Sequence, residues 1–64
     1  MRMNQKCNGK RYCVFAKRAN EKAWSDWTAS DDINVAMKQV AFVRKLGYLG
    51  KVTDRKEQKV ITSD

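Results

Sequence analysis

A helix with clear ends is the feature that most constrains the fold of this chain. Ser30 stands before two aspartates, a pattern in which the hydroxyl caps free backbone amides and the acidic groups suit the positive end of the helix dipole. Gly47 follows basic residues and can adopt the left-handed conformation that ends a helix. Apolar residues recur at helical spacing between these signals, so the sequence predicts one helix, about 31–46.

Four strand-like segments flank this helix, two on each side. Each is short, rich in β-branched or aromatic residues and bounded by turn residues. An antiparallel sheet with the helix packed on one face is the simplest arrangement for this order, so we predict a small α+β domain of ββαββ type. The predicted strands are residues 10–18, 23–28, 48–53 and 58–62.

The chain has 64 residues, which is close to the lower limit for a domain that folds alone. We expect a single domain over residues 10–62, preceded by a basic, flexible lead-in at 1–9. Small domains often gain stability from a disulfide, a metal or oligomerisation, so a homodimer is one expectation. A bridge between Cys7 and Cys13 would close only a short loop, and we expect thiols instead.

The chain has no apolar segment long enough to span a bilayer or to act as a secretory signal. We therefore expect a cytoplasmic protein that does not associate with membranes, in a compartment that keeps thiols reduced.

The predicted helix is apolar on two sides. Its core face consists of Ile33, Ala36, Met37, Val40 and Val43. A second stripe, on roughly the opposite side, consists of Val35, Phe42 and Leu46. In one interpretation the N-terminal segment or the last strand covers this stripe. In the other, the stripe is an interface for a protein partner or a second copy of the chain.

The net charge of +7 is unevenly distributed. Residues 1–22 carry seven Lys and Arg against Glu21 alone, so an anionic partner is favoured, either nucleic acid or an acidic protein surface. Basic side chains beside aromatic residues on a sheet can neutralise phosphates and stack bases. The predicted nucleic-acid-binding residues are Lys10, Arg11, Lys17, Arg18, Lys22 and Trp24. A second basic group consists of Arg55, Lys56 and Lys59. It either extends this phosphate-binding surface or belongs to an ordinary hairpin turn whose charges are solvated.

Two tryptophans lie three residues apart in the second predicted strand. In a regular strand Trp24 and Trp27 point to opposite faces, so only one reaches the core unless a bulge intervenes. Trp24 is the expected exposed residue because its face also carries Asp26 and Thr28. Tyr12, Phe15 and the other tryptophan are expected in the core.

The residue types that most enzymes need are missing. The chain has no histidine and no glycine-rich phosphate loop, and its two cysteines lack the partners of a zinc site. Capping accounts for the adjacent Asp31 and Asp32. We therefore expect no catalysis, no cofactor and no metal.

The element order resembles that of short accessory proteins of phages and mobile elements. It also resembles the three-stranded-sheet-plus-helix DNA-binding domains of integrases and plant transcription factors, although the connectivity differs. This resemblance implies contact between the sheet face and nucleic acid. The leading hypothesis is a small non-enzymatic module that binds nucleic acid mainly electrostatically. The alternative is a phage-type accessory protein that binds and modulates a host protein through the helix and the basic surface.

Overall fold

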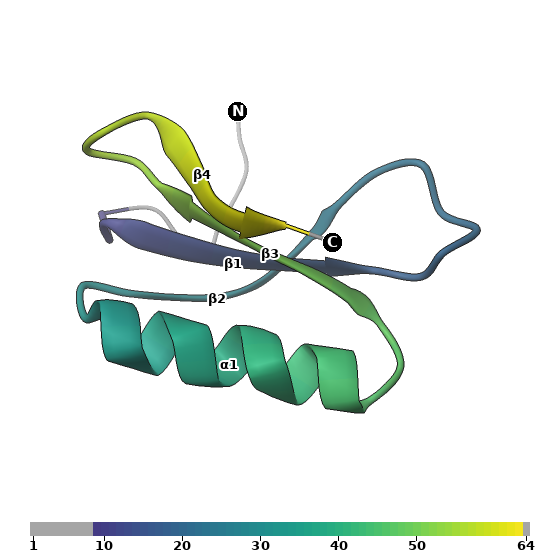
Figure 1. Ribbon diagram of the computed structural model, residues 1–64. Helices are drawn as coiled ribbons and strands as arrows, with labels where there is room; N and C mark the ends of the chain where they lie inside the picture. Colours follow the sequence, from purple (N-terminus) through teal and green to yellow (C-terminus); the bar gives the residue numbers. More distant parts are fainter. Residues whose placement is uncertain (1–8, 64) are drawn as a thin grey trace.

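The computed structural model describes residues 9–63 and contains four strands and one helix. The elements are β1 (Tyr12–Lys17), β2 (Ser25–Ser30), α1 (Ile33–Lys45), β3 (Leu49–Asp54) and β4 (Lys59–Ser63). The strands form one antiparallel sheet, and α1 packs on one of its faces (Figure 1). The predicted α+β fold with the order ββαββ is confirmed.

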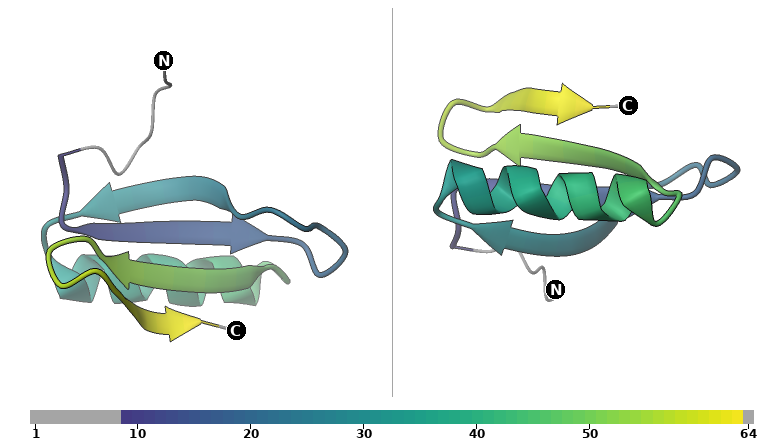
Figure 2. Two further views of the ribbon diagram at one scale, coloured as in Figure 1. Left: turned by 90° about the horizontal axis from the view of Figure 1, so that it is seen from above. Right: turned by 60° about the horizontal axis from the view of Figure 1, so that its bottom comes forward.

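The strand order β2-β1-β3-β4 places β1 in the interior of the sheet. Because β1 pairs antiparallel with both β2 and β3, these two neighbours run parallel to each other. Helix α1 connects them and crosses β1 on the way, whereas β4 lies beyond the helix at the far edge (Figure 2). The interior position of β1 agrees with the apolar residues on both of its faces.

The core lies between α1 and the strands β1, β2 and β3, on which the helix packs. Its buried members are Val14, Ala16, Ala36, Val40, Val43 and Val52, with Tyr12, Trp27 and Tyr48 packed against them. Since side chains alternate along a strand, the neighbours of these residues project from the opposite side of the sheet. We call that side the open face; it includes Cys13, Phe15, Lys17, Lys51 and Thr53.

Helix α1 comes very close to β3 at Gly50. A Cβ atom at this position would lie 2.6 Å from Val40 Cγ2 and 2.9 Å from Val43 Cγ2. Both distances are shorter than van der Waals contact, so a side chain here would push the helix from the sheet.

The start of the helix differs from the prediction. Asp32 is the N-cap, and its carboxylate accepts a hydrogen bond of 2.8 Å from the Asn34 amide. Ser30 Oγ instead accepts from the Asp32 amide at 3.0 Å. The prediction that Ser30 caps the helix is therefore wrong, because this hydroxyl orders the turn before the cap.

The end of the helix agrees with the prediction. Gly47 has a φ of 97°, and its amide donates to the Arg44 carbonyl. The Tyr48 amide donates to the Val43 carbonyl, which completes the hydrogen bonds of a Schellman motif.

The core face of α1 is narrower than predicted. Met37 is 37% exposed, so its assignment to the core is wrong, and Ile33 is only half-buried. The physical reason is that the sheet covers only the arc of the helix centred on Ala36, Val40 and Val43, which are buried.

A bulge in β2 determines where the tryptophans point. Val14 lies opposite Thr28 and Phe15 lies opposite Asp26, so Trp27 is the additional residue on β2. The expectation that Asp26 and Thr28 share a face is wrong because the bulge separates them. Trp27 packs against the core, as expected for one of the two tryptophans.

We predict that Gly50→Ala lowers the free energy of unfolding by about 1–3 kcal/mol, as overpacking of a core does. Urea unfolding of Gly50→Ala, Val40→Ala and the double variant measures this cost. The double variant should be more stable than the sum of the two single effects implies, because the shortened Val40 side chain makes room for the new Cβ. Wild-type stability of Gly50→Ala would contradict this account of the helix–sheet contact.

Candidate nucleic-acid interface

The structure separates the predicted basic residues into two groups at opposite ends of β1. Lys10 and Arg11 precede the strand, near the turn between β3 and β4. Lys17, Arg18 and Lys22 lie at the other end, in or beside the connection to β2. These residues therefore do not form one continuous surface.

At the first end, Arg11 is engaged in an internal salt bridge. Its guanidinium donates from Nε and Nη2 to the two carboxylate oxygens of Asp54, at 3.0 and 2.9 Å. Asp54 is only 2% exposed and also accepts from the amides of Lys56 and Glu57. The Arg11 hydrogen bonds, followed by these amides, lower the pKa of Asp54 to about 2.

Lys10 at the same end also has an acidic neighbour. Its Nζ lies 3.8 Å from Asp31 Oδ2, and both side chains are exposed. The Arg11 amide donates to the other oxygen of Asp31 at 3.0 Å. Carboxylates thus offset the positive charge of this end locally.

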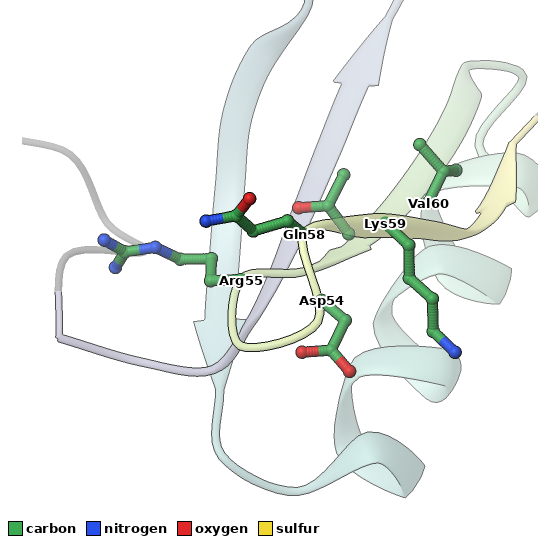
Figure 3. A pocket seen from close by; sticks show the side chains of 6 residues that line it. Asp54, Arg55, Gln58, Lys59 and Val60 are labelled. Atoms are coloured by element: carbon green, nitrogen blue, oxygen red, sulfur yellow. The ribbon is translucent and has the colours of Figure 1, made fainter.

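The turn between β3 and β4 forms an open hollow of about 550 Å³ (Figure 3). It is lined by Thr53, Asp54, Arg55, Gln58, Lys59 and Val60. Figure 3 shows Asp54 and Lys59 on one side of the turn, with Arg55 and Gln58 directed away from them. Asp54 is bonded to Arg11, and the two cations that line the hollow, Arg55 and Lys59, do not converge on one point.

At the second end, two lysines lie over aromatic rings on the open face. Lys17 Nζ is 5.1 Å and Lys51 Nζ is 4.7 Å from the centre of the Trp24 ring. Lys51 Nζ is also 5.1 Å from the centre of the Phe15 ring. We call Phe15, Lys17, Trp24 and Lys51 the open-face cluster.

Strand register explains this cluster. Phe15 lies opposite Lys51 of β3, and Lys17 follows Phe15 on the same face of β1. Trp24 immediately precedes β2 and reaches over both lysines. The sequence prediction included Lys17 and Trp24, missed Lys51 and expected Phe15 in the core. Phe15 is instead half-buried on the face opposite α1.

The cluster retains its positive charge. Within residues 9–63, no salt bridge joins Lys17 or Lys51 to a carboxylate. Lys17 Nζ donates only a long hydrogen bond of 3.3 Å to the Glu21 carbonyl. Cation–π contacts orient an ammonium without neutralising it, so both lysines remain attractive to an anion.

Arg18 and Lys22 extend the positive charge beyond the cluster. The Arg18 guanidinium lies 6.0 Å from the centre of the Tyr48 ring, on the helix side. It borders a hollow of about 340 Å³ lined by Ala16, Lys17, Arg18, Glu21, Ser25, Trp27 and Tyr48. Lys22 is exposed in the β1–β2 loop, which projects past the sheet (Figure 2).

The second stripe of the helix is exposed. Val35, Phe42 and Leu46 are 43%, 49% and 53% exposed, and we call them the helix strip. The interpretation that the last strand covers it is wrong, because β4 pairs with β3 at the sheet edge and leaves all three residues exposed. The hydrogen bond between α1 and β4, from Arg44 Nη2 to Thr62 Oγ1 at 3.2 Å, does not involve the strip. The N-terminal lead-in and Cys7 lie outside the described residues.

Two further observations concern metal ligands and membrane-spanning helices. Across residues 9–63, no group of three or more His, Cys, Asp or Glu is arranged to hold a metal ion. No helix in this part of the chain has the length and apolar character needed to cross a membrane.

Comparisons with protein-family models, with curated proteins and with solved structures give no match.

The salt bridge at the first end predicts a pH-dependent stability. The pKa of Asp54 falls from its ordinary 3.8 to about 2, so the ionised carboxylate stabilises the fold above pH 4. That contribution is lost as the pH falls through 2. We expect Asp54→Asn to be less stable than wild type in urea at pH 7, with the difference shrinking toward pH 2.

Asp26→Asn is the matched control, because Asp26 has no salt bridge within residues 9–63. It should change stability little at either pH. An Asp54→Asn difference that stayed constant from pH 7 to pH 2 would contradict the role of the Arg11–Asp54 pair.

Proposed function

We propose that this chain is a non-enzymatic module that binds single-stranded nucleic acid through the open-face cluster. One observation carries the proposal: two aromatic rings and two lysines gather on the sheet face that α1 leaves uncovered, and no carboxylate within residues 9–63 forms a salt bridge with either lysine. Aromatic rings stack bases and lysines neutralise phosphates, so this set of groups suits both parts of a nucleotide. The proposal includes a cytoplasmic location.

Stacking and phosphate contact are linked in this cluster. A base that stacks on Trp24 replaces a lysine ammonium over one ring face. The displaced ammonium of Lys17 or Lys51 then pairs with a neighbouring phosphate. Arg18 and Lys22 lie farther along the same end of the sheet, where they can attract the continuing strand.

The width of the sheet favours a single strand over a duplex. Four strands span roughly 14 Å from β2 to β4 at ordinary strand spacing, before side chains are added. The major groove of B-DNA is only about 12 Å wide, so the whole open face does not enter it. A single strand can lie across the face and present unstacked bases to Trp24 and Phe15.

The contributions of the predicted basic residues differ in this proposal. Lys17 and Lys51 lie beside Trp24, and in the described part of the chain neither forms a salt bridge. Lys10 and Arg11 contribute less because Asp31 and Asp54 already pair with them.

Fluorescence anisotropy with labelled random-sequence single-stranded DNA and RNA tests the electrostatic part. We expect roughly micromolar binding at low salt that weakens steeply as salt rises. Replacing Lys17 and Lys51 together with Ala should lower the log–log salt slope by about 1.4, since each contact contributes about 0.7 on single strands. Lys56→Ala, which removes one exposed turn charge, should leave the slope almost unchanged.

Two results would overturn the electrostatic part of the proposal. One is no binding of either nucleic acid at low salt. The other is an unchanged salt slope in the Lys17, Lys51 double variant. A duplex probe in the same titration should bind more weakly than the single strand; tighter duplex binding would contradict the single-strand assignment.

Substitution of Trp24 tests whether a base stacks on this ring. We expect Trp24→Ala to weaken binding by about 1–3 kcal/mol, the usual cost of losing one base–aromatic stack. Trp24→Phe keeps a ring and should retain most of the affinity. Circular dichroism confirms that both variants fold. Equal affinity of the alanine variant and the wild type would show that Trp24 stacks no base.

The alternative function, modulation of an acidic host protein, draws on the exposed helix strip. It requires one partner to contact the strip and the basic surface together. The strip lies on the helix side, whereas the open-face cluster lies on the opposite side of the sheet. The geometry therefore supports this alternative less well. Partner binding that survives moderate salt would favour it over nucleic acid.

A further inference from the structure

The helix strip runs along one side of α1. At 3.6 residues per turn, its three residues fall within an arc of about 40° on α1. Phe42 lies beside β2, because its ring contacts the Trp27 ring at a centroid distance of 6.3 Å. Trp27 is itself held by a 3.2 Å hydrogen bond from its Nε1 to Gln39 Oε1. Trp27 therefore supports the Phe42 ring from the inner side, while the outer side of the strip stays exposed to solvent.

Charges along α1 have opposite signs at its two ends. Asp31 and Asp32 stand at the start, and Lys45 stands at the last residue of the helix; all three are exposed. A second copy of α1 placed antiparallel brings the acidic start of one helix beside the basic end of the other. Two copies related by a two-fold axis form this contact twice.

We infer that the helix strip is a homodimer interface in which two α1 helices pack antiparallel. When Phe42 is placed opposite Val35 of the second copy, the start of α1 and the two aspartates before it lie beside Lys45 and Leu46 of that copy. The apolar residues and the charge pairs thus fit in a single register. This inference is independent of the proposed nucleic-acid binding, since it uses the other side of the sheet.

The same register brings one pair of like charges together. Lys38 lies near the middle of α1, so its ammonium faces Lys38 of the second copy beside the two-fold axis. Each chain also carries a net charge of +7. Salt screens these repulsions and also the attraction between the Asp and Lys pairs. Because the net charge of +7 on each chain outweighs these pairs, dimerisation strengthens as salt rises, which is the opposite of nucleic-acid binding.

The interface is small. A helix of 13 residues is about 20 Å long, and a single helix pair lies at the low end of stable interfaces. The dimer is therefore weak and needs a protein concentration on the order of 10 μM to 1 mM to be detected.

Sedimentation velocity over this concentration range, at low and moderate salt, tests the inference. The wild type should form more dimer as concentration and salt rise. Phe42→Glu should abolish the dimer, and Lys45→Glu should weaken it by placing like charges beside Asp31. Lys38→Ala should strengthen it. Lys56→Glu, a matched charge reversal in the β3–β4 turn, should have much less effect than Lys45→Glu.

Circular dichroism and thermal unfolding show whether each variant folds. Because Phe42 is half exposed, we expect Phe42→Glu to remain folded as a monomer. A wild type that stays monomeric up to 1 mM would overturn the inference. The strip would then be assigned to binding of a different protein. A persistent dimer in Phe42→Glu would also overturn it. Weaker association of Lys38→Ala would exclude the antiparallel register.

Discussion

The packing of α1 against Gly50 determines which surfaces of this protein face solvent. Val40 and Val43 lie so close to β3 that a Cβ at Gly50 would overlap them, and this contact places the helix across β1. One helix covers only one face of a four-stranded sheet. The open-face cluster therefore lies on the uncovered face of the sheet. The helix strip stays exposed on the outer side of α1. Both proposed binding surfaces follow from this single packing contact.

The distribution of carboxylates separates structural cations from those available to a ligand. At one end of β1, Arg11 pairs with the buried Asp54 and closes the turn between β3 and β4. At the other end, the ammonium groups of Lys17 and Lys51 rest over aromatic rings. A salt bridge must be broken before an arginine can bind phosphate, whereas a lysine over a half-buried ring can leave it without breaking a salt bridge. The cation at one end of β1 thus stabilises the fold, whereas those at the other end can bind an anionic ligand.

Local patterns predicted the elements, but pairing could not be predicted from them. The glycine after Leu46 correctly marked the helix end, and the apolar faces of residues 12–16 correctly placed β1 inside the sheet. Lys51 was missed because its position opposite Phe15 depends on strand register, which no local pattern specifies. The bulge at Trp27 changed the faces of Asp26 and Thr28 for the same reason. Met37 was assigned to the core because periodicity does not show how wide an arc the sheet covers.

The decisive measurement is NMR mapping of amide and indole chemical shifts during titration with a short single-stranded oligonucleotide, because it locates the binding surface residue by residue. Binding through the open face should produce the largest changes at the Trp24 indole and at the amides of Phe15, Lys17 and Lys51. Signals from the helix strip should change little at low protein concentration. Changes concentrated at Lys10, Arg11 and the β3–β4 turn, or on α1, would contradict the assignment of the open face as the binding surface.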